Sequence, residues 1–219
     1  MEPTNDKSKS RATQGVPEPT IRRMPVYLNI VKKIKEAGQT TISAPQIGQQ
    51  LNLDSTQVVK DISYTGVVGK PKIGYQIEEL IASLEDFLGY NRNHEAFLVG
   101  AGFWGSALIQ YPGFPESVIK IVAAFDNDRN KIGTEIAGVP VFGIEKYRDM
   151  AERLHISIGI ITTPPEIAQE IADMMVSWGI KAIWNFTPAK LKVPSHIIIQ
   201  DTHIYDNLAV IVSKLTKLK

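Results

Sequence analysis

The sequence contains no cysteine among its 219 residues, and it has only four histidines. The absence of cysteine excludes disulfide bonds, thiolate metal sites, a cysteine nucleophile and redox sensing through thiols. No apolar run approaches the roughly 18 residues of a membrane-spanning helix, and residues 5–10 are polar, unlike the core of a signal peptide. We therefore expect a cytoplasmic protein with no membrane partner, and no residue pattern predicts a metal site.

The charge is unevenly distributed along the chain. Residues 1–77 carry 11 Lys or Arg against 6 Asp or Glu, a net charge of +5, whereas residues 78–219 carry 13 against 17, a net charge of −4. A basic front half joined to an acidic back half suits a nucleic-acid-binding module attached to a domain that avoids nucleic acid. Chance variation in solvated faces gives the same numbers, so charge alone leaves both interpretations open.

The front of the chain has the spacing of a helix-turn-helix. Residues 1–19 predict a flexible tail, and residues 20–90 predict a DNA-binding domain. Three helices are expected from their caps and stripes: one from Thr20 to Gly38, one from Ser43 to Asn52, and one from Asp54 or Ser55 to Gly66. The alternative is a small helical bundle whose charges are only solvated.

A basic hairpin is expected after the third helix. Two β-prone pieces flank the residues from Gly69 to Lys72, which predicts the wing of a winged helix. Polar side chains on the third helix can reach base edges, while lysines in the wing suit phosphates. The expected DNA-contacting residues are Ser55, Thr56, Gln57, Lys60, Ser63, Tyr64, Lys70 and Lys72.

A glycine-rich turn marks the start of the back half. Gly100, Gly102 and Gly105 follow the apolar run 96–99 with Gly-x-Gly-x-x-Gly spacing, and Phe103 and Trp104 fill the variable positions. Such glycines permit a tight turn, let a pyrophosphate approach the backbone and allow close helix–strand packing. Asp126 lies 21 residues after Gly105, at a strand end. A carboxylate there accepts from the ribose hydroxyls and repels a 2′-phosphate. This pattern predicts binding of NAD(H) in preference to NADP(H).

The rest of the back half alternates strands and helices, which predicts a parallel sheet in a Rossmann domain over residues 91–202 and a C-terminal helix over residues 203–219. The expected elements are strands at 97–99, 118–125, 138–141, 156–161, 182–186 and 197–199, helices at 145–154 and 166–178, and a last helix from 201 onward. No histidine follows the carboxyl end of a strand, and no segment remains for a substrate domain. A binding domain without catalytic residues predicts a sensor, not an enzyme.

These motifs together resemble the Rex family of redox-sensing transcriptional repressors, over about residues 20–212. The motifs that carry the resemblance are residues 57–64, Gly66 and Gly69, Gly74-Tyr75, residues 100–102 and 105–108, residues 111–114, Phe125-Asp126, Thr163-Pro164 and residues 185–188. The resemblance implies a homodimer with exchanged C-terminal helices, in which NADH and NAD+ compete and NADH releases double-stranded operator DNA. It also implies that Tyr111 and Phe186 lie near the nicotinamide.

The expected dinucleotide-binding residues combine the glycine turn with the strand ends and the family motifs. They are Gly100, Ala101, Gly102, Phe103, Trp104, Gly105, Tyr111, Asp126, Thr162, Thr163, Pro164, Asn185 and Phe186. The sequence departs from the family pattern at Asn29, Val59, Thr65, Phe103-Trp104 and Pro71-Lys72. The alternatives are a CoA- or nucleotide-binding protein similar to acyl-CoA synthetase subunits, and a nucleotide-binding structural protein whose front half contacts other proteins.

Overall fold

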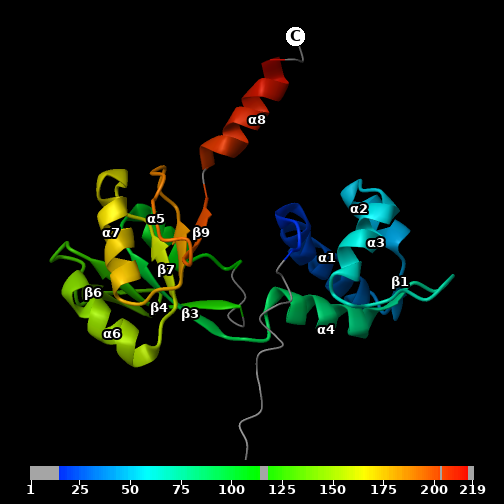
Figure 1. The fold of residues 1–219 in the computed structure, drawn as a ribbon, viewed down its shortest axis with the longest axis horizontal. Helices are drawn as coiled ribbons and strands as arrows, with labels where there is room; N and C mark the ends of the chain where they lie inside the picture. The colour runs from blue at the N-terminus through cyan, green and yellow to red at the C-terminus, as the bar shows by residue number, and fades with distance from the viewer. Residues whose placement is uncertain (1–14, 114–117, 203, 217–219) are drawn as a thin grey trace, which may run out of the picture. The chain divides into compact units, whose positions relative to one another are not determined.

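The computed structural model describes residues 15–113, 118–202 and 204–216 and divides them into two compact units. One unit ends at Arg92 and the other begins at Asn93 (Figure 1). In the described parts of the chain, no helix is both long and apolar enough to cross a membrane.

The front unit is built mainly from helices. Its elements are α1 (Glu18–Glu36), β1 (Thr41–Ile42), α2 (Ala44–Leu51), α3 (Ser55–Ser63), β2 (Tyr75–Gln76) and α4 (Ile77–Leu88). A single core holds these helices together, and its fully buried side chains include Met24, Tyr27, Ile47, Ile62 and Leu80. Helix, short turn and second capped helix follow one another as the sequence predicts.

Local capping signals fix where α2 and α3 begin. Ser43 forms a capping box with Gln46, and the Asp54 carboxylate accepts a hydrogen bond from the backbone N–H of Thr56 at 2.7 Å. The expectation that Thr20 caps the first helix is wrong. That helix begins at Glu18 after Pro17, and the Thr20 hydroxyl instead donates to Asp61 at 2.9 Å.

The wing differs from the expected hairpin. Lys70 and Gly74 form one isolated bridge, with N–H to O=C distances of 2.8 and 2.9 Å, and residues 67–68 form no strand. The partner of β2 is β1, more than thirty residues earlier, with Ile42 opposite Tyr75. Gly74, at φ +91°, lies so close to the backbone of Ile42 that a side chain would collide with it. Turn signals predict a local hairpin, but β2 pairs with the distant β1 instead of with residues 67–68.

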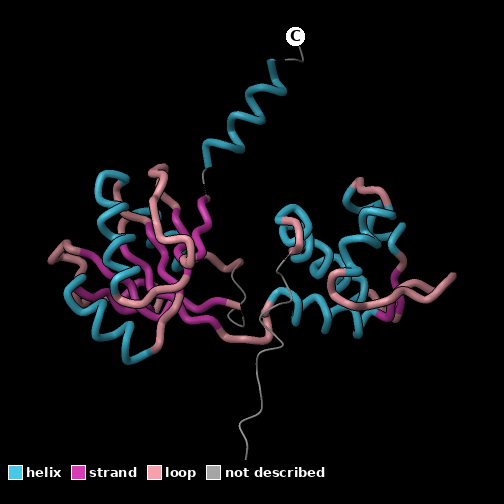
Figure 2. Tube along the Cα trace, viewed as in Figure 1, coloured by secondary structure: helices cyan, strands magenta, loops and turns pink. Residues whose placement is uncertain are grey.

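The back unit contains a seven-stranded sheet in the order β5-β6-β4-β3-β7-β8-β9, parallel except for β5. Its elements are β3 (His94–Val99), α5 (Phe103–Ile109), β4 (Ile119–Asp126), β5 (Glu135–Ile136), β6 (Val139–Gly143), η1 (Ile144–Lys146), α6 (Tyr147–Leu154), β7 (Ile158–Ile161), α7 (Pro165–Ser177), β8 (Ala182–Asn185), β9 (Ile198–Asp201) and α8 (Ile204–Thr216). Figure 2 shows the strands between helices. The sequence missed β5, and it placed the start of β7 two residues too early.

The two faces of the sheet follow from strand alternation. Phe97 and Val99 pack with α6 and α7, whereas Ala96 and Leu98 pack on the opposite face with α5. The chain reverses strand order at β3, which has β4 on one side and β7 on the other. In open parallel sheets, ligands bind at the carboxyl ends of the strands beside such a reversal.

The described apolar side chains of α8 are exposed. The large ones are Tyr205, Leu208, Val210, Ile211, Val212 and Leu215. The sequence places its start at Asp201, but Asp201 is the last residue of β9, where it pairs with Asn185. The expected flexible tail lies largely outside the described residues, as do position 203 and the last three positions.

Candidate functional site

The glycine turn occupies the carboxyl end of β3. Gly100 has φ +104°, and a Cβ there would lie 2.8 Å from the carbonyl carbon of Thr162. A Cβ on Gly105 would collide with the carbonyl oxygen of Gly100, so this glycine allows α5 to pack against the turn. Gly102 differs from both, because a Cβ there would meet nothing within 4 Å. Its open backbone is the place where a ligand can approach most closely.

Hydrogen bonds tie the ends of three strands into one rigid edge. The N–H of Gly100 donates to the carbonyl of Phe125 at 2.8 Å. The hydroxyl of Thr162 donates to the carbonyls of Gly100 and Val99 at 2.8 and 3.2 Å. The glycine turn is thereby fixed to β4 on one side and to β7 on the other.

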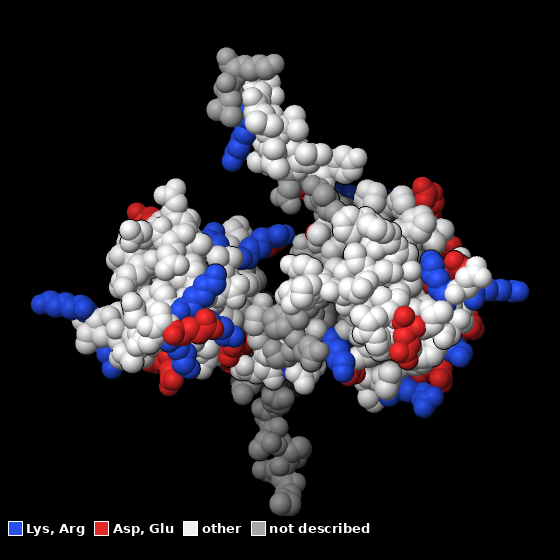
Figure 3. Space-filling view, turned by 180° about the vertical axis from the view of Figure 1, so that it is seen from behind, with Lys and Arg blue, Asp and Glu red and all other residues white. Residues whose placement is uncertain are grey.

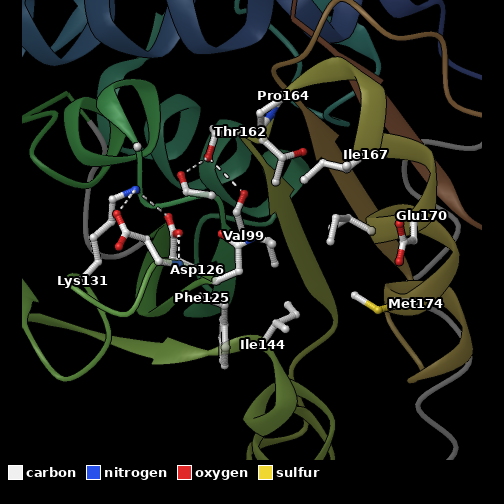
Figure 4. Close-up of a pocket in the computed structure, with 16 residues that line it drawn as sticks. Val99, Phe125, Asp126, Lys131, Ile144, Thr162, Pro164, Ile167, Glu170 and Met174 are labelled. Carbon is white, nitrogen blue, oxygen red and sulfur yellow. Dashed lines mark hydrogen bonds and ion pairs between the residues drawn. The ribbon is translucent and has the colours of Figure 1, made fainter.

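Asp126 ends β4 and faces the same edge (Figure 4). One carboxylate oxygen accepts from the backbone N–H of Asp128 at 2.9 Å, and the other accepts from Lys131 at 3.0 Å. The Asp126 side chain is only 9% exposed, whereas that of Lys131 is 37% exposed. A partly exposed cation therefore covers a nearly buried acid, and a ligand hydroxyl that bonds to Asp126 must compete with Lys131 for this carboxylate.

A pocket of about 560 Å³ opens between these residues and α7. Six of the expected dinucleotide-binding residues line it: Gly100, Gly102, Asp126, Thr162, Thr163 and Pro164. Figure 4 shows Asp126 and Lys131 on one side of the pocket, and Glu170 and Met174 of α7 on the other. The pocket thus combines a glycine turn, an acid and an apolar wall.

Sequence reasoning missed the apolar wall. Ile144 of η1 and Ile167, Ile171 and Met174 of α7 line the pocket opposite Asp126. The α7 residues recur with i, i+4, i+7 spacing, which places them on one helix face. The same spacing is typical of a core stripe, so only the packed structure shows that this face borders a cavity.

Thr163 supplies a polar group that suits a ligand. Its hydroxyl is buried at the edge of the pocket, and it has no hydrogen-bond partner within the described parts of the chain. An unpaired buried hydroxyl is costly, and such groups are normally satisfied by water or a ligand. This hydroxyl, the open backbone of Gly102 and the strand-end carboxylate of Asp126 all fit a dinucleotide.

The other expected dinucleotide-binding residues do not line this pocket. Ala101 and Gly105 are buried beneath the turn, and Phe103, Trp104 and Tyr111 are exposed by 87%, 53% and 56%. Phe186 is half-buried and packs against Trp184, with ring centroids 4.6 Å apart and ring planes tilted by 47°.

Asn185 is fully buried, and its side chain bonds within the protein. Its amide nitrogen donates to Ala189 O and to an Asp201 carboxylate oxygen, and its oxygen accepts from the N–H and hydroxyl of Thr187. These bonds hold the loop after β8. The Asn185-Phe186-Thr187-Pro188 motif therefore has a structural role that its spacing does not reveal.

The outward face of α3 presents the expected DNA-contacting residues. Thr56, Lys60 and Ser63 are exposed, Tyr64 is 36% exposed at the end of the helix, and Ser55 is half-buried. Lys70 and Lys72 are exposed in the wing, and Figure 3 shows basic side chains projecting from the front unit. The opposite stripe of α3, Val58, Asp61 and Ile62, is buried.

Asp61 is the centre of a buried hydrogen-bond network that links α1 to α3. Arg23 donates to both carboxylate oxygens at 2.6 and 2.9 Å, and Thr20 and Tyr27 donate at 2.9 and 2.7 Å. Gln57 donates its side-chain N–H to Asp61 at 2.8 Å, so this residue is oriented by the core. Burial opposes ionisation, but the hydrogen bonds outweigh it and lower the pKa of Asp61 to about 2.

Two family models match the chain. The model described as "CoA binding domain" matches residues 91–189, and the model described as "Putative DNA-binding protein N-terminus" matches residues 15–63. The two matches fall on the back and front units respectively.

Relatives cover nearly the whole chain. A protein of Bacteroides fragilis called "Redox-sensing transcriptional repressor Rex" is 42% identical over 211 residues, which is 96% of each chain. A protein of Treponema denticola with the same name is 44% identical over 201 residues, covering 91% of this chain and 96% of its own.

Solved structures share the fold over both units. The crystal structure of RSP in complex with β-NAD+ and operator DNA has a TM-score of 0.87 at 32% identity, covering 92% of this chain and 93% of that one. RSP in complex with β-NADH has a TM-score of 0.83 at 32% identity, covering 94% and 100%. The expected fold, a winged helix-turn-helix followed by a Rossmann sheet, is confirmed.

Proposed function

The chain belongs to the Rex family of redox-sensing transcriptional repressors, and we propose that it binds NAD(H) at the glycine turn and operator DNA through α3 and the wing. One observation carries this proposal. The same chain has a pocket beside Gly102 and Asp126 and, in its front unit, a helix α3 with an exposed polar face. The family consists of repressors and not enzymes. Operator binding with NAD+ and release with NADH then make the protein a sensor of the NADH/NAD+ ratio.

Different pocket residues are assigned to different parts of the dinucleotide. The open backbone at Gly102 receives the pyrophosphate, because no side chain blocks it, while Gly100 lets the turn pass close to Thr162. Asp126 accepts from the ribose hydroxyls, and the apolar wall of Ile144 and Ile167 accommodates a flat base. The Thr163 hydroxyl supplies a further hydrogen bond.

Phosphate and base contacts are assigned to different side chains. Lys70 and Lys72 of the wing contact phosphates, which contributes affinity for all sequences. We assign the base contacts to Lys60, which is exposed, and to Gln57, which is half-buried. The Gln57 amide N–H donates to Asp61, so the amide oxygen is the atom that we assign to a base contact. Ser55, Thr56, Ser63 and Tyr64 complete the surface.

We further propose that the protein is a cytoplasmic homodimer in which α8 packs on the partner subunit. The described side chains of α8 are exposed, and many of them are apolar, including Leu208, Ile211 and Leu215. Such an apolar helix face normally marks a protein interface. Two subunits also match the paired half-sites that helix-turn-helix dimers bind about one DNA turn apart.

Asp126→Ala is expected to weaken NADH binding by about 1–2 kcal/mol, because a charge-assisted hydrogen bond to the ribose is lost. It should also narrow the preference for NADH over NADPH, since the repulsion of the 2′-phosphate disappears. Calorimetric titration with both nucleotides measures this. Asp149→Ala is the matched control, because Asp149 is an exposed acid on α6 of the same unit and does not line the pocket. NADPH binding as tightly as NADH to the unchanged protein would contradict the assignment.

The sensor function is tested by titrating a complex of the protein and its operator with NADH, with NAD+ and with CoA. NADH should release the DNA, and NAD+ and CoA should not. By linkage, operator DNA must weaken NADH binding by the same factor. Release by CoA alone would favour the CoA-binding alternative.

Phe186→Ala is expected to reduce the NADH effect on operator affinity while leaving the ligand-free operator affinity nearly unchanged. The reason is the implied place of Phe186 near the nicotinamide, although its ring also packs against that of Trp184. Thermal melts run beside the operator titrations separate the two roles. Phe142→Ala, which removes another half-buried ring of the same unit, is the control. A destabilised Phe186 variant with normal NADH coupling would remove this residue from the switch.

A further inference from the structure

The centre of the outward face of α3 is an aliphatic side chain. Val59 is 48% exposed, although it lies in the middle of the helix. Three exposed residues surround it on the helix: Thr56 three positions before it, Lys60 directly after it and Ser63 four positions after it. Val58 and Ile62 already supply the buried stripe of this helix, so Val59 is not needed for the core.

Val59 separates two hollows on the surface of the front unit. One, of about 300 Å³, is lined by Thr56 and Lys60 with the start of α2. The other, of about 550 Å³, is lined by Ser63 and by Lys70 and Lys72 of the wing. Val59 lines both. The exposed valine is therefore flanked on each side by cations that complement a polyanion.

The chemistry of the DNA major groove limits what such a side chain can recognise. Guanine and adenine present N7 acceptors there, cytosine presents an N4 donor, and only thymine presents an apolar group, its C5-methyl. An aliphatic side chain against a donor or acceptor removes its water without replacing the hydrogen bond. Against the thymine methyl, it buries apolar surface on both partners.

We propose that Val59 selects thymine in the operator half-site by packing against the C5-methyl group. The proposal rests on the proposed function of α3 as the operator-reading helix. The selectivity has a defined size, because burial of one methyl group corresponds to about a fourfold change in affinity. Val59 therefore contributes to sequence discrimination and carries none of the charge that determines overall affinity.

Deoxyuridine tests this directly, because it differs from thymidine only by the missing C5-methyl. High-affinity duplexes are first selected from a random pool with the unchanged protein. Each thymine is then replaced singly by deoxyuridine, and affinities are measured for the unchanged protein and for Val59→Ala. Replacement of one particular thymine in each half-site should lower the affinity of the unchanged protein about fourfold. The same replacement should lower the affinity of the variant substantially less.

A matched control uses a second exposed valine of the same unit. Val26 on α1 is 42% exposed, so Val26→Ala removes the same atoms away from α3 and should keep the full deoxyuridine effect. Val59→Arg should instead select guanine at that position, because arginine bonds to O6 and N7.

The outcomes separate the inference from the function on which it rests. Specific DNA binding with the same deoxyuridine effects in the unchanged protein and in Val59→Ala would overturn the role of Val59 and leave the repressor function standing. Failure to prefer any duplex over random DNA would overturn the operator-binding function, and this inference with it.

Discussion

Gly102→Ala is expected to lower the affinity for NADH by roughly 100-fold while the protein stays folded. Gly102 has φ −80° and ψ −161°, a conformation open to alanine, and a Cβ there would meet no protein atom within 4 Å. The added methyl instead occupies space that the pyrophosphate needs. Losing close charge-assisted contacts there costs about 3 kcal/mol, which corresponds to the 100-fold loss.

Calorimetry with NADH measures the loss, and circular dichroism melts check the fold. Gly105→Ala provides the contrast, because its Cβ would collide with the carbonyl oxygen of Gly100 and should destabilise the back unit. Ala107→Ser, an exposed position on the same helix, should change neither property. A Gly102→Ala protein that binds NADH normally would show that the phosphates do not approach this turn.

Asp61→Ala is expected to destabilise the front unit by about 3–5 kcal/mol. The substitution removes the partner of the partly buried Arg23 and leaves the buried Tyr27 hydroxyl without its acceptor. Breaking a buried ion pair from one side costs this much because the remaining charge stays uncompensated. The expected effect approaches the whole stability of a small domain.

The distribution of tryptophan lets this effect be assigned to one unit. Trp104, Trp178 and Trp184 are the three tryptophans of the sequence, and all belong to the back unit. In chemical denaturation, circular dichroism follows both units, whereas tryptophan fluorescence follows the back unit alone. A shifted dichroism transition with an unchanged fluorescence transition is expected. Equal shifts in both signals would contradict a role confined to the front unit.

The same residue should make the front unit sensitive to strong acid. The pKa of Asp61 is lowered from 3.8 to about 2, so its ionised form is favoured by folding. Its contribution of about 2–3 kcal/mol is present above about pH 4 and is lost as the pH falls towards 2. Asp61→Asn should be less stable at neutral pH and should lack this acid-dependent loss.

Signals that act over a few residues were readable in the sequence. The caps at Ser43 and Asp54 predict where α2 and α3 begin, because the stabilising hydrogen bonds lie within three residues. The glycine turn and Asp126 predict the strand-end pocket, because parallel strands align their carboxyl ends. These local rules are sufficient for the fold class and for the glycine turn and the acid of the pocket.

Long-range packing decided what the sequence could not. Ile42 pairs with Tyr75, so the wing has no long hairpin, and Thr20 bonds to Asp61 across 41 positions, so it caps nothing. The sequence predicts that Asn185 contacts the dinucleotide. In the structure this side chain is fully buried and makes four hydrogen bonds within the protein, which hold the loop after β8. Propensity and periodicity describe a residue's own neighbourhood, and they are silent about distant partners. The sequence by itself therefore determined the helices of the front unit and the parallel strands of the back unit, while the tertiary structure decided the strand pairing of the wing and which side chains line the pocket.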